Sequence, residues 1–295
     1  MKAPRWPWRA CCDPTPERCG NGRVAQIVGG WLQWSFGSQE RSVGTPSPTE
    51  PFVDANILGF QMLMLALITS CLMSSCSVAQ EKDVSRARQR MVTEQLARRD
   101  ITNQLVLHAM STVPRHEFVP YSLRDQAYND NPLPIGYSQT ISQPYIVAFM
   151  TQALNPRTNE IVMEVGTGSG YQAAVLATLV KEVYTIEIVT PLAERAEADL
   201  RRLAFTNVHV RAGDGYEGWA AAAPFDAIIV TCAPEKVPQL LLDQLKHGGR
   251  MIIPVGPAHD QSLYLFIKEG GTVRQQSILP VRFVPMTGKV RVSGP

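Results

Sequence analysis

The sequence predicts an α/β fold in which a mostly parallel sheet carries helices on both faces and has an antiparallel C-terminal edge. First, continuous apolar stretches alternate with helical patterns from residue 160 onward. Second, a glycine-rich turn joins the first of these stretches to the helix after it. Third, the last apolar stretches follow one another without a helix between them. Buried parallel strands have continuous runs of Val, Ile and Met, whereas strands joined by short turns pair antiparallel.

Two helices and a long loop are predicted ahead of the sheet. Apolar residues at helical spacing run from Met91 to Ile101, and a second set runs from Val106 to Val113 and stops before a proline. The section 118–136 that follows is rich in proline and turn residues, so we expect it to lack regular structure. Long ordered loops more often carry binding residues than packing residues.

The elements of the predicted sheet follow in a regular order. The strands are expected at 160–165, 182–188, 208–212, 225–231 and 250–254. The helices between them are expected at 171–179, 191–203 and 237–245. Three further strands are expected at 262–268, 272–279 and 281–284. Because no helix separates these three, at least one of them should pair antiparallel at the sheet edge.

The glycine turn predicts a binding site for a nucleotide-like ligand. Glycines permit positive φ and close approach, and the helix start presents unpaired N–H groups. A dinucleotide fingerprint would need a sixth-position glycine, where the chain has Tyr171. The spacing is instead similar to that of S-adenosylmethionine-dependent methyltransferases, although plain strand–helix junctions also use such turns. The expected ligand contacts here are Glu164, Gly166, Thr167, Gly168, Ser169 and Gly170.

Polar residues at the ends of three other strands complete the predicted site. Glu187 ends the second strand, and its carboxylate can accept hydrogen bonds from both ribose hydroxyls of an adenosine. Asp214 and Gly215 follow the third strand, beside the expected adenine, and Thr231 ends the fourth. Each has a plain structural reading as a solvated strand end or a tight turn. Together they favour a ligand, because ligands bind at the carboxyl ends of parallel strands.

Ser142 has two compatible readings. It lies two residues before Pro144, so it is a good helix N-cap with proline near the first turn. Its hydroxyl could also orient a methyl acceptor, with Gln139 and Thr140 shaping the acceptor groove. The spacing alone does not separate the two roles.

Composition excludes several classes of function. The 295 residues are 45% hydrophobic and 18% charged with a net charge of +2, and no basic face suggests nucleic acid as a partner. The five histidines show no ligand spacing, so no metal site is expected. Of six cysteines only Cys232 lies beyond residue 76, which excludes a disulfide framework in the folded part and suits a reducing compartment.

The chain divides near residue 80. Residues 1–54 are expected to form a disordered leader, 55–80 an apolar segment, and 81–295 the catalytic domain. The stretch 57–73 is the one part that could contact a membrane, as a signal or anchor helix. Its flank carries Glu50 and Asp54 in place of a basic region, which disfavours export. We expect a cytoplasmic protein, with export or anchoring through 55–80 as the alternative.

Six segments closely resemble the protein-L-isoaspartate O-methyltransferase family. They are PRHEFVP (114–120), PLPIG (132–136), QTISQP (139–144), MEVGTGSGY (163–171), GDG (213–215) and VRFVP (281–285). The resemblance covers roughly residues 86–288. It implies a Rossmann-like methyltransferase sandwich with a seven-stranded sheet and a rearranged C-terminal strand order. By the resemblance, Ser142 matches the active-site serine, while Gly166, Gly168, Gly170, Glu187 and Asp214 match contacts to S-adenosyl-L-methionine.

The reaction that the resemblance implies is methyl transfer to the free α-carboxylate of L-isoaspartyl residues, with D-aspartyl residues as a second acceptor. That carboxylate is ionised at neutral pH, so it needs no general base. Catalysis then rests on positioning and desolvation, with Ser142 donating a hydrogen bond to the acceptor. The expected partners are damaged proteins and peptides, and the protein is expected to be a monomer. Two alternatives stay open: a methyltransferase acting on a small molecule or RNA, and a non-catalytic S-adenosylmethionine-binding protein.

Overall fold

The computed structural model of the protein describes residues 83–289 together with Met64. The leader predicted at 1–54 and, apart from Met64, the apolar segment predicted at 55–80 lie outside the described residues. Within this described part of the chain, no helix combines the length and the apolar character that crossing a membrane requires.

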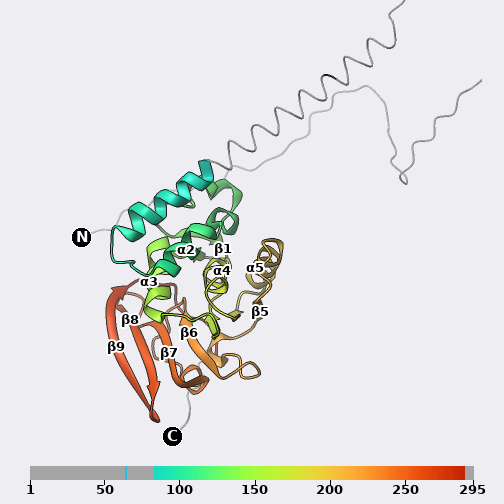
Figure 1. The fold of residues 1–295 in the computed structure, drawn as a ribbon. Helices are drawn as coiled ribbons and strands as arrows, with labels where there is room; N and C mark the ends of the chain where they lie inside the picture. Colours follow the sequence, from blue (N-terminus) through green and yellow to red (C-terminus); the bar gives the residue numbers. More distant parts are fainter. Residues whose placement is uncertain (1–63, 65–82, 290–295) are drawn as a thin grey trace, which may run out of the picture. The chain divides into compact units, whose positions relative to one another are not determined.

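The predicted α/β sheet is confirmed, with seven strands in the order β5-β4-β3-β6-β7-β8-β9. The strands are β3 (Ile161–Val165), β4 (Glu182–Glu187), β5 (Val208–Ala212), β6 (Phe225–Val230), β7 (Leu245–Val255), β8 (Gln261–Glu269) and β9 (Thr272–Val281). Strands β3 to β7 pair in parallel, whereas β8 pairs antiparallel with β7 and β9 antiparallel with β8. Figure 1 shows β8 and β9, in orange and red, at one edge of the sheet.

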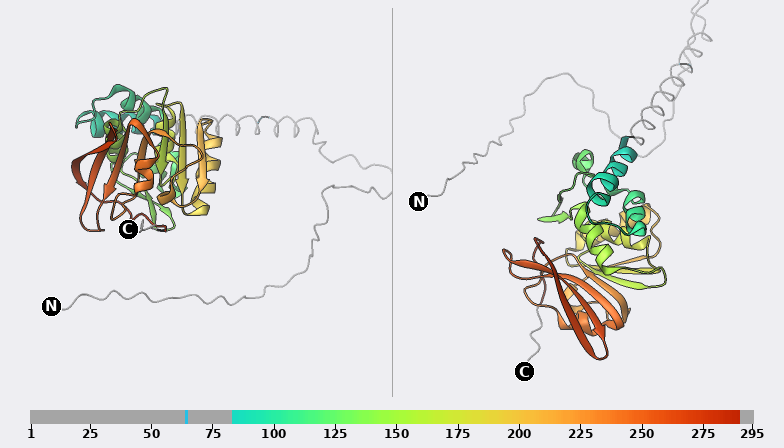
Figure 2. Two further views of the ribbon diagram at one scale, coloured as in Figure 1. Left: turned by 90° about the horizontal axis from the view of Figure 1, so that it is seen from below. Right: turned by 60° about the vertical axis from the view of Figure 1, so that its left-hand side comes forward.

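Helices cover both faces of the sheet. They are α2 (Gln104–Thr112), α3 (Pro144–Leu154), α4 (Tyr171–Ala177), α5 (Thr190–Arg202) and α6 (Gln239–Asp243). Alternate residues of β3 enter different apolar clusters, because successive side chains of a strand point to opposite faces. Val162 packs in the cluster that holds residues of α2, α3, α4 and α5. Met163 packs in the cluster that holds residues of α6. Figure 2 gives two further views of these layers.

Two predicted elements differ in the C-terminal part. The strand expected at 281–284 is wrong, since β9 ends at Val281 and the next residues leave the sheet. The helix expected at 237–245 is shorter, because α6 ends at Asp243 and Leu245 already opens β7. In both places the local apolar pattern predicts a helix or strand, but the chain there forms hydrogen bonds with residues distant in the sequence instead.

The section 118–136 was expected to be irregular, and this expectation is wrong. Short 3-10 helices occupy η2 (Arg115–Phe118) and η3 (Tyr121–Gln126). A hairpin then forms from β1 (Leu133–Gly136) and β2 (Gln139–Ile141). Pro134 is tolerated because it lies in a two-stranded sheet with its side chain exposed.

The predicted N-terminal helices are present with one difference. Residues 83–90 are α-helical and continue as the π-helix η1 (Met91–Ala97). Ile101 is buried but lies after the end of this helix, so its contribution to the core comes from the connection to α2. The second helix agrees with its prediction, since α2 carries buried Val106, Ala109 and Met110.

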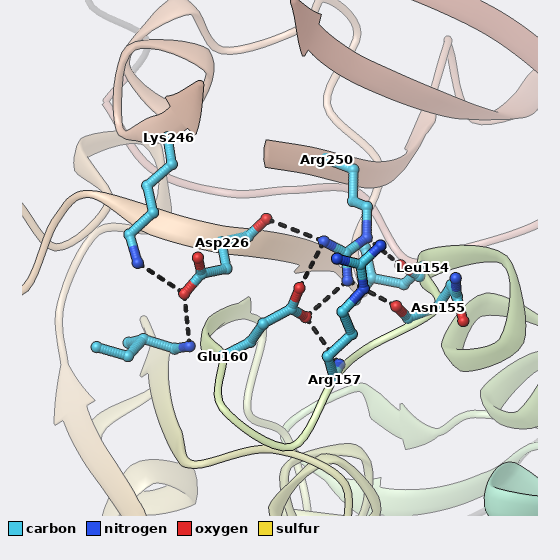
Figure 3. A network of polar contacts seen from close by, with 8 residues as sticks. Leu154, Asn155, Arg157, Glu160, Asp226, Lys246 and Arg250 are labelled. Atoms are coloured by element: carbon cyan, nitrogen blue, oxygen red, sulfur yellow. Dashed lines mark hydrogen bonds and ion pairs between the residues drawn. The ribbon is translucent and has the colours of Figure 1, made fainter. Parts of the chain in front are cut away.

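An ion network closes the amino end of the sheet (Figure 3). The Arg250 guanidinium donates two hydrogen bonds to the Glu160 carboxylate, at 2.9 and 2.7 Å, and another to the carbonyl of Asn155. The Asp226 carboxylate accepts from Lys246 Nζ and from the backbone N–H of Ile161, both at 2.8 Å. The predicted site lies at the carboxyl ends of the parallel strands. This network lies at their amino ends, so it supports the sheet at a distance from the site.

Candidate active site

A cavity lies at the carboxyl ends of β3, β4 and β6. Strand β4 lies on one side of β3, and β6, which follows later in the chain, lies on the other side of β3. The carboxyl ends of these strands therefore form the topological switch point of the sheet. Eleven of the predicted site residues line it: Gln139, Thr140, Ser142, Glu164, Gly166, Thr167, Gly168, Ser169, Glu187, Gly215 and Thr231.

Backbone conformation explains why the turn after β3 contains glycine. Gly166, Gly168 and Gly170 have φ of 95°, 53° and 86°. A Cβ on Gly166 would lie 2.5 Å from Thr231 Oγ1, so no side chain fits there without moving Thr231. The Thr231 hydroxyl in turn donates to the carbonyl of Gly166 at 2.7 Å, which fixes the turn against β6. Thr231 therefore supports the turn as well as lining the cavity.

The Glu187 carboxylate holds the turn from the neighbouring strand. It accepts the backbone N–H of Gly168 at 2.8 Å and that of Val189 at 3.0 Å. Glu187 is buried, and the carbonyl of Ile186 before it accepts the N–H of Gly166. A carboxylate has about four acceptor sites, so two remain for a ligand.

Glu164 is the most unusual group in the cavity wall. Its side chain is fully buried, Oε2 accepts from Thr185 Oγ1 at 2.6 Å, and Oε1 has no partner among the described residues. Burial raises the pKa of Glu164 to about 8; the Thr185 hydrogen bond lowers it, and the Glu187 carboxylate raises it. A buried acceptor without a donor is costly unless a ligand supplies one.

Cys232 also lines the cavity, but it is not an active nucleophile. Burial, with smaller contributions from the Glu187 and Glu164 carboxylates, raises the pKa of its thiol to about 12. The thiol therefore stays protonated at neutral pH. In the described part of the chain, no group of three or more His, Cys, Asp or Glu side chains could hold a metal ion.

Two predicted site residues lie beside the cavity rather than in its wall. A Cβ on Gly170 would lie 3.2 Å from Leu200 Cδ1, so this glycine lets α5 pack closely against the turn. The Asp214 carboxylate accepts the N–H of Tyr216 at 2.9 Å and that of Lys289 at 2.6 Å. Asp214 thus holds the C-terminal segment near the site.

Residues 282–287, just before Lys289, form a wall of the cavity that the sequence pattern did not predict. Buried Gln261 accepts the N–H of Phe283 at 2.7 Å and donates to its carbonyl at 3.2 Å. The backbone of Ala233 pairs with that of Val284 and Met286 at 2.9 and 2.8 Å. The VRFVP motif (281–285) indicates that this segment matters, but its apolar residues predict a strand at 281–284. Its lining residues are Val284, Pro285, Met286 and Thr287.

Ser142 lies where the cavity meets a second, more open groove. Four residues line both spaces: Thr140, Ser142, Thr231 and Val284. Ser142 does not cap α3, because Gln143 is the N-cap and the Asp130 carboxylate accepts the N–H of Tyr145. The Ser142 hydroxyl has no hydrogen bond to another described residue, so it can donate to a bound group.

Comparisons with known proteins agree with this geometry. A family model of protein-L-isoaspartate(D-aspartate) O-methyltransferase matches residues 86–291. Protein-L-isoaspartate O-methyltransferase of Opitutus terrae is 55% identical over 228 residues, which cover 77% of this chain and 97% of that protein.

Solved structures show the same fold. One, named protein-L-isoaspartate O-methyltransferase, is 29% identical with a TM-score of 0.63, and the match covers 68% of this chain and 66% of that one. A Plasmodium falciparum protein of the same name, crystallised with S-adenosyl-L-homocysteine, is 25% identical with a TM-score of 0.61, covering 68% of this chain and 98% of that one. The chain belongs to the protein-L-isoaspartate(D-aspartate) O-methyltransferase family.

Proposed function

We propose that the protein transfers a methyl group from S-adenosyl-L-methionine to the free carboxylate of L-isoaspartyl and D-aspartyl residues in damaged proteins and peptides. The resulting ester closes to a succinimide, which can reopen to normal aspartate. The observation that carries the proposal is the position of Ser142, which lines both the cavity at the glycine turn and the adjoining groove. Family membership supports the same acceptor.

The cavity suits S-adenosyl-L-methionine on three counts. The glycine turn brings bare backbone to the wall, and a Cβ on Gly215 would overlap with Val165, so the wall there must stay free of side chains. Glu187 keeps acceptor sites for ribose hydroxyls. The partnerless Glu164 Oε1 suits the amino group of the methionyl part. The bound molecule supplies an electrophilic methyl group, and residues of this chain orient it.

The groove suits an extended peptide. Most of its lining is apolar or uncharged, and Gln143 and Arg282 are its strongly polar members. Such a groove would recognise mainly the backbone of a bound peptide. Recognition of the backbone fits an enzyme whose substrates contain damaged sites in many different sequences. Gln139 and Thr140, at the start of β2, would shape the end of the groove nearest the cavity.

Ser142 would donate a hydrogen bond to one oxygen of the acceptor carboxylate. The other oxygen is then free to attack the methyl carbon in line with the departing sulfur. No proton moves, because the acceptor is already ionised and the leaving group is a neutral thioether. Positioning and desolvation of the carboxylate between Ser142 and Thr231 would supply the acceleration. The cytoplasmic location expected above stays a prediction.

Two peptides that differ in a single linkage test the proposal. Both receive S-adenosyl-L-methionine labelled in the methyl group, and one contains isoaspartate where the other contains aspartate. We expect label in the isoaspartyl peptide alone, lost slowly as the ester closes. Label in both peptides, or in neither while the cosubstrate binds, would reject the proposed acceptor.

A further inference from the structure

We infer that Arg115 is a positioning residue for methyl transfer, which acts by fixing the main chain at Ser142. This inference rests on the proposed function. Arg115 opens η2 and is fully buried, yet it lines neither the cavity nor the groove. It therefore acts on the reaction only through the residues that it holds.

The guanidinium joins two segments that are distant in the sequence. Nε donates to the carbonyl of Ala127 at 2.7 Å, and Nη2 donates to the carbonyl of Ser142 at 2.8 Å. This second bond fixes the peptide unit between Ser142 and Gln143, next to the side chain that carries the hydroxyl. A planar fork with fixed donor directions can hold two carbonyls at once, whereas a lysine ammonium is a single point of charge.

A third contact connects the same guanidinium to the cosubstrate side. Its central carbon lies 4.8 Å from the centre of the Tyr171 ring. Tyr171 lines the cavity and follows the glycine turn directly, as the first residue of α4. Arg115 thus sets Ser142 and the start of α4 relative to each other. In-line transfer depends on this relation, because the acceptor carboxylate must be held in line with the methyl carbon and the departing sulfur.

The buried guanidinium of Arg115 is held without a salt bridge to any described residue. None of the described carboxylates forms a salt bridge with it, and its Nη1 is buried without a hydrogen-bond partner. Burial lowers the pKa of Arg115 to about 10. An apolar residue of similar volume would avoid this desolvation. Burial of this cation is unfavourable, and its hydrogen bond to the Ser142 carbonyl fits a role in positioning Ser142.

Arg250 supplies a control. It is a second largely buried arginine that donates to backbone carbonyls, those of Leu154, Asn155 and Asp226, and it also forms a salt bridge with Glu160. It lies at the amino ends of the parallel strands, away from the cavity. Arg115→Lys and Arg250→Lys both keep the positive charge but lose the planar guanidinium that donates to more than one carbonyl at once. We expect kcat to fall about tenfold in Arg115→Lys and to change less than about twofold in Arg250→Lys, with little change in cosubstrate affinity for either.

A double-mutant cycle with Ser142→Ala gives the decisive test. If Arg115 acts through Ser142, Arg115→Lys should lower kcat less than about twofold when alanine is present at position 142. An equal loss of kcat in both backgrounds would overturn the inference. An equal loss in Arg115→Lys and Arg250→Lys would assign the effect to general destabilisation, and would also overturn it.

Amide hydrogen exchange separates failure of the inference from failure of the proposed function. We expect faster exchange across residues 139–143 in Arg115→Lys than in Arg250→Lys, whatever the acceptor. Unchanged exchange there would overturn the positioning role even if activity fell. A wild-type protein that does not methylate isoaspartyl peptide would reject the proposed function, and the exchange measurement would still decide whether Arg115 orders the Ser142 segment.

Discussion

The carboxylate of Asp130 accepts the backbone N–H of Tyr145 at 2.9 Å, in the first turn of α3. The same carboxylate accepts from the Gln143 side chain at 2.8 Å and from Arg99 at 3.0 Å. The helix is therefore capped by a loop residue that precedes it by more than a dozen positions. This arrangement leaves the hydroxyl of Ser142 free of the capping role that its place in the sequence suggests.

Replacing Asp130 with alanine should destabilise the protein. The start of α3 loses its acceptor, and Arg99 and Gln143 lose their partner, so we expect the free energy of unfolding to fall by about 2 kcal/mol. Urea denaturation measures this change. Asp125→Ala, at an exposed position of the same section, is the control and should change stability by less than about 0.5 kcal/mol. Equal effects of the two substitutions would remove Asp130 from the capping role.

Ser142→Ala should affect turnover and leave the fold intact. A hydrogen bond to a charged acceptor contributes about 1.5–3 kcal/mol, so we expect kcat to fall roughly 10- to 100-fold. Stability should change by less than about 0.5 kcal/mol, since the hydroxyl has no partner in the described structure. Cosubstrate affinity, measured by calorimetry, should stay the same. A large loss of stability or of cosubstrate affinity would mean that Ser142 has a structural role.

The sheet and the site differ in how far sequence predicts them. Strands β3 and β6 follow from largely apolar runs, and β4 and β5 from their places between helical patterns. The parallel order then brings Glu164, Glu187 and Thr231 together at the carboxyl ends of the strands. The wall at 282–287 depends on Gln261, a buried amide whose partner lies about twenty positions away. The positioning of Ser142 depends on Arg115, which opens η2, and on Asp130, which lies in a loop. Such polar contacts between distant segments leave no periodic pattern.

Gly166→Ala should close the cavity wall. The added Cβ would lie 2.5 Å from Thr231 Oγ1, and the backbone has a positive φ of 95°. We expect cosubstrate affinity to fall at least about 30-fold and stability to fall by about 2 kcal/mol. Gly248→Ala is the control, because its φ of 76° imposes similar strain while a Cβ there meets nothing within 4 Å. If the two variants bound cosubstrate equally well, the turn would not lie in the binding site.

Glu164 should make cosubstrate binding release a proton. In the free protein, burial raises the pKa of this carboxyl to about 8, so it is mostly protonated at pH 6.5. The α-amino group of S-adenosyl-L-methionine is a cation at this pH, since such groups titrate near pH 8. A cation beside the partnerless Oε1 favours the carboxylate. We expect about one proton to be released per molecule bound at pH 6.5, measured by calorimetry in two buffers of different ionisation enthalpy.

Glu164→Gln should abolish the proton release and weaken binding by about tenfold or more, because an amide does not ionise beside the ammonium group. The same substitution should change the pH dependence of stability without ligand. A carboxyl whose pKa is raised on folding contributes stability that is complete below the unfolded pKa of about 4.5 and is lost as pH rises through about 8. Glu164→Gln should therefore melt above the wild type at pH 9, and the difference should shrink toward pH 5. Glu194→Gln removes the same charge from an exposed helical position and should retain the proton release. Proton release that persists in Glu164→Gln would assign the titration to another group and leave Glu164 without a role in binding.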